Sequence, residues 1–179
     1  MKPGSSQSWR KNGDAAAFDH GAWDFRARQF ASSAKFLLAS HDVRIKTPDF
    51  EAIMLLPTAE FLLSLSIELI CKAYLLKKKA VNREAIYRHD VFTLLPEGLL
   101  SQEQKKLMLH AERYVVWAGR YPTPKWTTEW SKETFDVPST FLNGIEQIDA
   151  SQLPNSSSRA RCDELAALFE HLRATWAES

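Results

Sequence analysis

The feature that most constrains the fold is the stretch from Ala59 to Lys79, which contains neither glycine nor proline. Its apolar residues fall on two faces at helical spacing: Leu62, Leu65, Leu69, Ala73 and Leu76 on one, and Leu63, Ile67, Ile70 and Tyr74 on the other. A helix that is apolar on most sides usually lies at the centre of a bundle. Pro57 suits the first turn of this helix, because its missing N–H is not needed there. The sequence therefore predicts a buried central helix that begins near Pro57, after a connection over residues 44–50.

Helical periodicity continues through most of the rest of the chain. Residues 22–41 carry an apolar stripe at i, i+4, i+7 and i+11, and Ser101 with Gln104 has the pattern of a capping box. Further helices are predicted at 22–41, 91–95, 101–119 and 140–150, with a last one capped by 156–158. Strand-like alternation is not sustained anywhere. We therefore predict an all-α bundle of four or five main helices.

Size and composition indicate one ordinary globular domain. The chain has 179 residues, of which 45% are hydrophobic and 25% charged, with a formal net charge of +1. Residues 1–17 read as a flexible leader and 18–179 as the domain. The two cysteines have no metal-ligand spacing, and no apolar run reaches 18 residues. We expect a cytoplasmic protein with no membrane span, no metal and no cofactor, and the usual hydrolase, kinase and dehydrogenase motifs are absent.

A polar stripe runs along the central helix. Glu60, Ser64, Glu68 and Lys72 are each four residues apart and therefore lie on one face. Spacing alone favours a solvated edge, with Glu68 and Lys72 as a surface ion pair worth a few tenths of a kcal/mol. The alternative is a polar strip lining a cleft.

A second group lies on the helix that follows Ser101. His110, Arg113, Trp117 and Arg120 project together, and cations interleaved with an aromatic ring can hold a phosphate and stack a base. The alternative is that Trp117 is a core residue and the two arginines are its solvated flank. The pattern makes these residues candidates for RNA binding.

A third candidate pairs Arg83 with His89. An imidazole can move a proton to or from a ribose 2′-hydroxyl, and a guanidinium can hold the scissile phosphate. This pair would permit RNA cleavage without a metal ion. A chain with this content of arginine and histidine is expected to contain about one such spacing by chance.

Three segments, read in order, resemble the HEPN family. Residues 66–76 (SIELICKAYLL) resemble the central HEPN helix, in which a glutamate is followed four residues later by Lys-Ala. Residues 88–95 (RHDVFTLL) are similar to the His-Asp segment that opens the next helix, and 119–122 (GRYP) to a later Arg-Tyr-Pro element. The resemblance extends over roughly residues 55–125.

The resemblance implies a bundle of four to five helices that commonly dimerises and acts on RNA or nucleotides, often in toxin–antitoxin or phage-defence systems. It also implies that a polar seam forms from five residues: Glu68, Lys72, His89, Asp90 and Arg120. With the aromatic stretch at 117–130, it predicts a homodimer.

One departure from the family bears on catalysis. Ribonuclease members carry an Arg and a His with four to six residues between them on a later helix, and this chain has no such pair there. We therefore favour a binding module for RNA, a nucleotide or a cognate partner protein. The first alternative is a metal-independent ribonuclease that uses Arg83 and His89, and the second is a structural adaptor whose polar pairs are all surface salt bridges.

Overall fold

The computed structural model describes residues 19–46, 50–80, 86–89, 91–115 and 157–178. These residues form four α-helices and one 3-10 helix: α2 (His20–Arg44), α3 (Phe50–Lys77), η1 (Val91–Leu94), α5 (Gln102–Arg113) and α6 (Arg159–Glu178). No strand occurs within these ranges. The predicted all-α class is confirmed.

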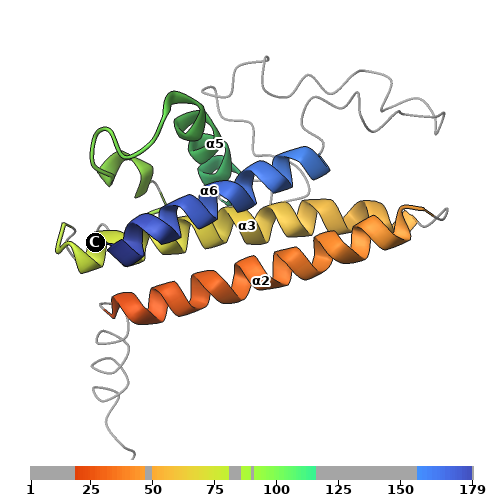
Figure 1. Ribbon diagram of the computed structural model, residues 1–179, viewed down its shortest axis with the longest axis horizontal. Coiled ribbons are helices and arrows are strands. Elements are labelled where there is room, and N and C mark those ends of the chain that lie inside the picture. Colours follow the sequence, from red (N-terminus) through yellow and green to blue (C-terminus); the bar gives the residue numbers. More distant parts are fainter. Residues whose placement is uncertain (1–18, 47–49, 81–85, 90, 116–156, 179) are drawn as a thin grey trace, which may run out of the picture.

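Helix α3 is the centre of the bundle, as the sequence predicts. Helices α2 and α6 lie along it, and α5 stands against it together with η1 (Figure 1). Leu63, Ile67 and Ile70 of α3 are at most 1% exposed. They share one core with Leu165 and Phe169 of α6. Burial of these apolar faces supplies most of the stability of the fold.

Helix α2 packs closely on α3 because its inner face is made of small residues. Ala27, Ala31 and Ala34 are buried, and the predicted stripe is the one that faces the core. Asp19 caps the helix by accepting a hydrogen bond from the amide of Gly21. The helix is somewhat longer at both ends than the predicted range of 22–41.

The predicted start of the central helix is wrong. Helix α3 begins at Phe50, so Pro57 lies inside it and residue 50 belongs to the helix and not to a connection. An interior proline removes one hydrogen bond and crowds the preceding turn, at a cost of about 3 kcal/mol. The fully buried Ala52 and a hydrogen bond from the Tyr114 hydroxyl to the Pro57 carbonyl (3.3 Å) favour the longer helix.

The capping box of α5 is confirmed in both directions. The amide of Gln104 donates to Oγ of Ser101 (3.2 Å), and the amide of Ser101 donates to Oε1 of Gln104 (2.9 Å). Helix α5 ends at Arg113. Residues 116–119 of the predicted helix, the predicted helix at 140–150 and the predicted leader at 1–17 lie outside the described residues.

The serine cap and the buried face predicted for the last helix are confirmed. Oγ of Ser158 accepts a hydrogen bond from the amide of Arg161 at 3.1 Å, and Leu165, Phe169 and Leu172 are buried. Met54–Lys77 within α3 is long and apolar enough to cross a membrane, with a mean hydropathy of 1.7 and 56% burial inside the bundle. A buried core helix has the same composition, so the absence of a membrane span stays a prediction.

Candidate functional site

The polar stripe of α3 is buried and is not a solvated edge. Glu60 and Ser64 are 0% and 1% exposed, and Glu68 and Lys72 are 5% and 4% exposed. The solvated reading favoured by spacing is therefore wrong, because neighbouring elements pack around α3 on several sides. A buried charge must find a partner, so each of these side chains indicates a specific contact.

Glu68, Lys72 and His89 contact one another. Nζ of Lys72 lies 2.6 Å from Oε1 of Glu68, and Nδ1 of His89 lies 3.0 Å from Oε2 and 3.2 Å from Oε1. A carboxylate only accepts hydrogen bonds, so Nδ1 of the imidazole carries the proton in this contact. The structure thus brings together three of the five residues of the predicted polar seam.

Helix α2 contributes an aromatic ring to this group. Nζ of Lys72 lies 5.2 Å from the centroid of the Trp23 ring, within the range of a cation–π contact. The ammonium is therefore held by a carboxylate of its own helix and by a ring from the neighbouring helix. No pattern in the sequence indicates this contact.

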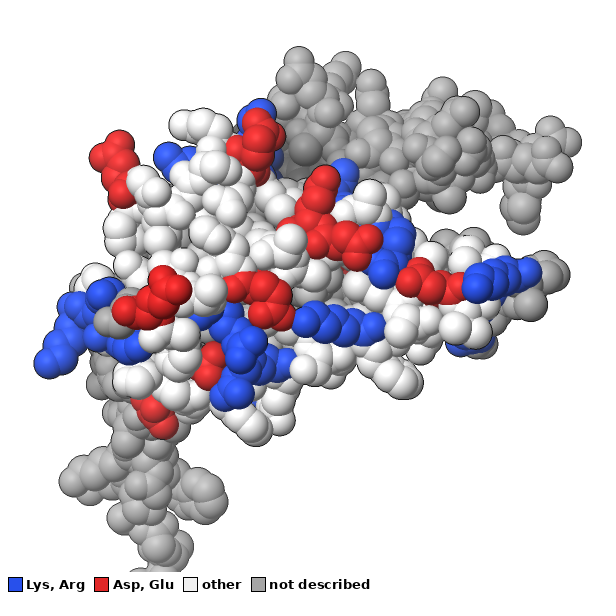
Figure 2. Space-filling view, in the orientation of Figure 1, with Lys and Arg blue, Asp and Glu red and all other residues white. Residues whose placement is uncertain are grey.

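His89 lies at the boundary between the buried pair and solvent. Its side chain is 37% exposed, against 6% for that of Glu68. Four exposed residues lie near it in the chain or at the end of α3, and with His89 we call them the basic end: Lys78, Lys79, Tyr87 and Arg88. Figure 2 shows Lys and Arg side chains gathered at the end of the molecule where α3 finishes.

A small cavity lies beside His89, between α3, η1 and α5. It is lined in part by Ser64, Glu68, His89, Met108 and Glu112, and its volume is about 10 Å³. That is roughly the space of one water molecule. Oγ of Ser64 is buried and has no hydrogen-bond partner among the described residues, so it could bind such a water. A larger ligand would have to bind at the surface, over the exposed edge of His89.

The N-terminal half of the stripe binds a second histidine. Nε2 of His110 lies 2.6 Å from Oε1 of the fully buried Glu60, and Nη1 of Arg161 lies 3.9 Å from the same oxygen. The hydroxyls of Tyr114 and Ser157 lie 3.0 Å apart, and burial raises the pKa of Tyr114 to about 12. These contacts join α5 and α6 to α3.

The group predicted to bind RNA on α5 is only partly described. His110 is directed at the buried Glu60, whereas Arg113 is exposed. Trp117 and Arg120 lie outside the described residues, as do Arg83 and Asp90. The proposed roles of these four residues stay predictions. The premise of the adaptor alternative is wrong for Glu68 and Lys72, because their ion pair is not on the surface.

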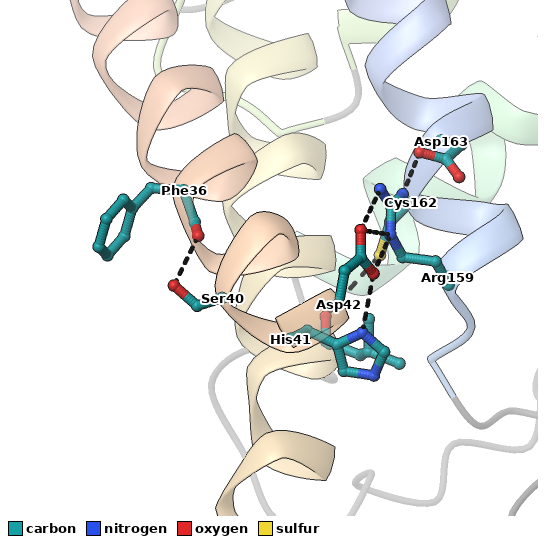
Figure 3. A network of polar contacts seen from close by, with 8 residues as sticks. Phe36, Ser40, His41, Asp42, Arg159, Cys162 and Asp163 are labelled. Atoms are coloured by element: carbon teal, nitrogen blue, oxygen red, sulfur yellow. Dashed lines mark hydrogen bonds and ion pairs between the residues drawn. The ribbon is translucent and has the colours of Figure 1, made fainter. Parts of the chain in front are cut away.

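A third polar network, which no sequence pattern indicated, joins α2 to α6 (Figure 3). Nε of Arg159 lies 3.0 Å from Oδ1 of Asp42, and Nη2 lies 3.1 Å from Oδ2. Arg159 also contacts Asp163 one turn along α6. The guanidinium, with a smaller contribution from His41, holds the pKa of Asp42 below its usual value. Asp42 and Arg159 are too far apart in the chain for spacing to reveal the contact.

Two further findings bear on the chemistry of the site. Among the described residues, no cluster of three or more His, Cys, Asp or Glu side chains could hold a metal ion. No family model, curated protein or solved structure matches the chain.

Proposed function

We propose that the chain is a HEPN-like module that binds RNA or a nucleotide at the basic end, without cleaving it. The observation that carries the proposal is the placement of His89, whose imidazole is fixed on a buried Glu68–Lys72 pair and half-exposed beside Tyr87 and Arg88. The contacts among Glu68, Lys72 and His89 are those that the family resemblance predicts for the polar seam.

The charge of the basic end suits a phosphate group. Lys78, Lys79 and Arg88 are exposed there, although the formal net charge of the whole chain is only +1. Local cations of this kind supply the salt-dependent part of nucleic-acid affinity. The contact between His89 and the buried Glu68 restrains the backbone at residue 89. The backbone of the adjacent Arg88 is therefore restrained as well.

Tyr87 adds a surface on which a base can stack. Its side chain is 56% exposed, which is unusual for an aromatic residue in a folded domain, and it immediately precedes Arg88. Proteins recognise single-stranded RNA by stacking splayed bases on aromatic rings or guanidinium groups beside phosphate contacts. In the basic end, Tyr87 supplies a ring for stacking and the next residue, Arg88, supplies a cation for a phosphate contact.

Binding of a labelled single-stranded RNA, followed by fluorescence anisotropy, tests the proposal. We expect Tyr87→Ala and Arg88→Ala each to weaken binding by about tenfold, which corresponds to about 1.4 kcal/mol. Competition with ATP and with inorganic phosphate separates recognition of a polymer, a nucleotide and a simple anion.

Lys106→Ala is the matched control, because Lys106 is an exposed cation on α5. It should bind with a Kd within about twofold of the wild type. The proposal fails if the wild-type protein binds no RNA or nucleotide at low salt, or if all three variants bind equally well.

One observation also favours the ribonuclease alternative. The carboxylate of Glu68 fixes Nδ1 of His89, and a carboxylate that orients a histidine in this way is a common part of acid–base catalysis. The other half of this alternative, Arg83, lies outside the described residues.

An RNA-cleavage assay with and without a chelator distinguishes the two functions. The ribonuclease predicts cleavage that resists chelation and is lost in His89→Ala and Arg83→Ala, together with growth arrest on expression in a host. The binding module predicts that wild-type protein leaves RNA intact under conditions in which it binds it.

A further inference from the structure

A cleft of about 480 Å³, which we call the α2–α6 cleft, opens between these two helices at the surface. Both helices pack mainly on α3 and only slightly on each other (Figure 1). Cavities of roughly 300–1,000 Å³ are typical of sites for small molecules. The cleft shares no lining residue with the small cavity beside His89. Six of the residues that line it are Asp24, Arg28, Glu170, Arg173, Ala174 and Trp176.

Each wall of the cleft carries one acid and one base. Nη2 of Arg28 lies 2.9 Å from Oδ2 of Asp24 on α2, and Nη1 of Arg173 lies 3.3 Å from Oε2 of Glu170 on α6. One guanidinium nitrogen makes the contact in each pair, and a guanidinium has five N–H donors. Both arginines therefore retain donors that a ligand anion can use while the two ion pairs persist.

The two carboxylates of the cleft differ in how well they are satisfied. Glu170 has a cation on each oxygen, because Lys35 lies 2.8 Å from its Oε1. Asp24 is only 4% exposed, and its Oδ1 is buried with no hydrogen-bond partner among the described residues. A buried acceptor without a donor is costly and rare in a folded protein. Asp24 therefore indicates a place where a donor from outside the bundle is needed.

A donor in the cleft can satisfy this oxygen after a small movement. The last torsion of an aspartate side chain is soft, so the carboxyl group turns easily about its Cβ–Cγ bond. Asp24 lines the cleft, and such a turn presents the unsatisfied oxygen to a group bound there. An ammonium group suits this position best, because it brings three N–H donors and the opposite charge.

Trp176 gives the cleft an aromatic wall that is held in place. Nζ of Lys77 lies 4.8 Å from the centroid of the ring and donates to the carbonyl oxygen of Trp176 at 3.0 Å. The edge of His20 also contacts the ring, with centroids 6.3 Å apart. Beside the ring, Ala174 adds a small apolar side chain to the lining. This part of the cleft favours an apolar group on a ligand.

The balance of charge in the lining selects between classes of ligand. Figure 2 shows acidic and basic side chains interleaved on the face where α2 and α6 lie. Two carboxylates in the lining would repel a phosphate or a nucleic-acid chain, and two guanidinium groups would repel a simple cation. A ligand with one charge of each sign avoids both penalties. An α-amino acid is the smallest common molecule that has both charges and an apolar side chain.

From these observations we propose that the α2–α6 cleft binds a free α-amino acid with an apolar side chain. The carboxylate of the ligand accepts hydrogen bonds from Arg28 and Arg173, and its ammonium group donates to Asp24. Its side chain lies against Trp176. The proposal uses no residue of the basic end, so it is independent of the proposed RNA function.

Isothermal titration calorimetry of the full chain with L-phenylalanine and L-leucine tests the proposal. We expect at least one of them to bind with a Kd on the order of 100 µM. N-acetyl-L-phenylalanine lacks the cation and L-phenylalaninamide lacks the carboxylate, so each should bind at least about tenfold more weakly than L-phenylalanine. Glycine, which lacks the side chain, should also bind at least about tenfold more weakly.

Two variants assign the binding to the cleft. Arg173→Gln and Asp24→Asn should each weaken binding by at least about tenfold, with an unchanged circular dichroism spectrum. Arg173 is half-exposed, so its variant is expected to fold even if Asp24→Asn does not. Arg26→Gln is the matched control, because Arg26 is an exposed arginine of α2 and is not among the residues that line the cleft. Its Kd should stay within about twofold of the wild type.

Four results would overturn the inference. The first is the absence of binding by both amino acids at about 10 mM. The second is equal binding of the free and the capped forms of phenylalanine, because the two charges would then not be read. The third is full binding by Arg173→Gln, which would place the site elsewhere. The fourth is binding of inorganic phosphate that depends on Arg173 when neither amino acid binds, which would make the cleft a site for a simple anion.

Discussion

At the scale of single residues, the defining feature of the molecule is a charged group kept in its core. Glu68 is 5% exposed and is held by Lys72 and His89. Removing two charges from water costs several kcal/mol per ion, and their mutual attraction offsets this only when the contacts are close. The Glu68–Lys72 distance is 2.6 Å, so the pair meets this condition. Removing one member alone should therefore lower the stability of the fold, because the other charge stays buried.

Lys72→Met should reduce the free energy of unfolding by about 3–5 kcal/mol, because it leaves the Glu68 carboxylate buried with His89 as its one remaining partner among the described residues. The double variant Glu68→Gln with Lys72→Met should recover a substantial part of this loss, since no charge is then left alone. Urea unfolding followed by circular dichroism measures both. Lys106→Met, at an exposed ion pair, is the control, and a loss of less than about 1 kcal/mol in Lys72→Met would show that the pair is solvated.

The two cysteines should be inert in the folded chain. Burial raises the pKa of the Cys71 thiol far above its usual value and that of Cys162 to about 12. At pH 8 almost no thiolate is present, and the thiolate is the reactive form. A thiol-specific chromogenic reagent should therefore label neither residue in native protein and both in denaturant. Rapid labelling of one thiol without denaturant would contradict the burial of that residue.

At the scale of elements, α3 departs most from what its own sequence favours. Pro57 lies seven residues into the helix, where no backbone N–H is available for a hydrogen bond. Helices can accommodate such a proline when packing on either side favours continuation. In α3, the buried Ala52 before Pro57 and Ala59 after it provide that packing.

Pro57→Ala should raise the free energy of unfolding by about 1–2 kcal/mol, because alanine restores the missing donor and relieves the crowding. The greater freedom of the unfolded chain offsets part of the gain. Thermal unfolding measures the change, and Pro96→Ala, in the turn after η1, is a comparison outside any helix. A lower stability in Pro57→Ala would indicate that the proline shapes a bend on which the packing depends.

Local patterns in the sequence predict the elements better than the contacts between them. The apolar period predicts α3 and the inner face of α2, and the Ser101–Gln104 spacing predicts the start of α5. Spacing also places Glu68 and Lys72 one turn apart. It cannot show which neighbours cover that face, so the burial of the stripe is visible only in the structure.

Contacts between distant segments leave no trace in a single sequence. Glu60 meets His110 across 50 residues, and Asp42 meets Arg159 across 117 residues. No local spacing relates these residues, because the contacts depend on the angle at which one helix lies on another. The contact between Glu68 and His89 also joins distant residues, 21 positions apart, and helical spacing does not relate them.

At the scale of the whole molecule, polar contacts hold the helices together at several points around the core. Glu60 and its partners join α3, α5 and α6, whereas Asp42 and Arg159 join the end of α2 to the start of α6. The second contact lies at the surface and closes the bundle at one end (Figure 3). Its contribution should therefore depend on pH in a way that core packing does not.

Asp42→Asn should lower the thermal midpoint at pH 7, and this difference from the wild type should shrink below about pH 3.8. The Arg159 guanidinium lowers the pKa of Asp42 from its usual value of 3.8, so the folded state favours the ionised carboxylate. The resulting stability is present above the unfolded pKa and is lost as the pH falls through the lower, folded value. At still lower pH both proteins carry a neutral side chain at position 42, and their midpoints should converge. Glu103→Gln, at an exposed pair within α5, serves as the control and should show little difference at either pH. An equal deficit of Asp42→Asn at pH 7 and pH 2 would mean that the side chain acts through packing and not through its charge.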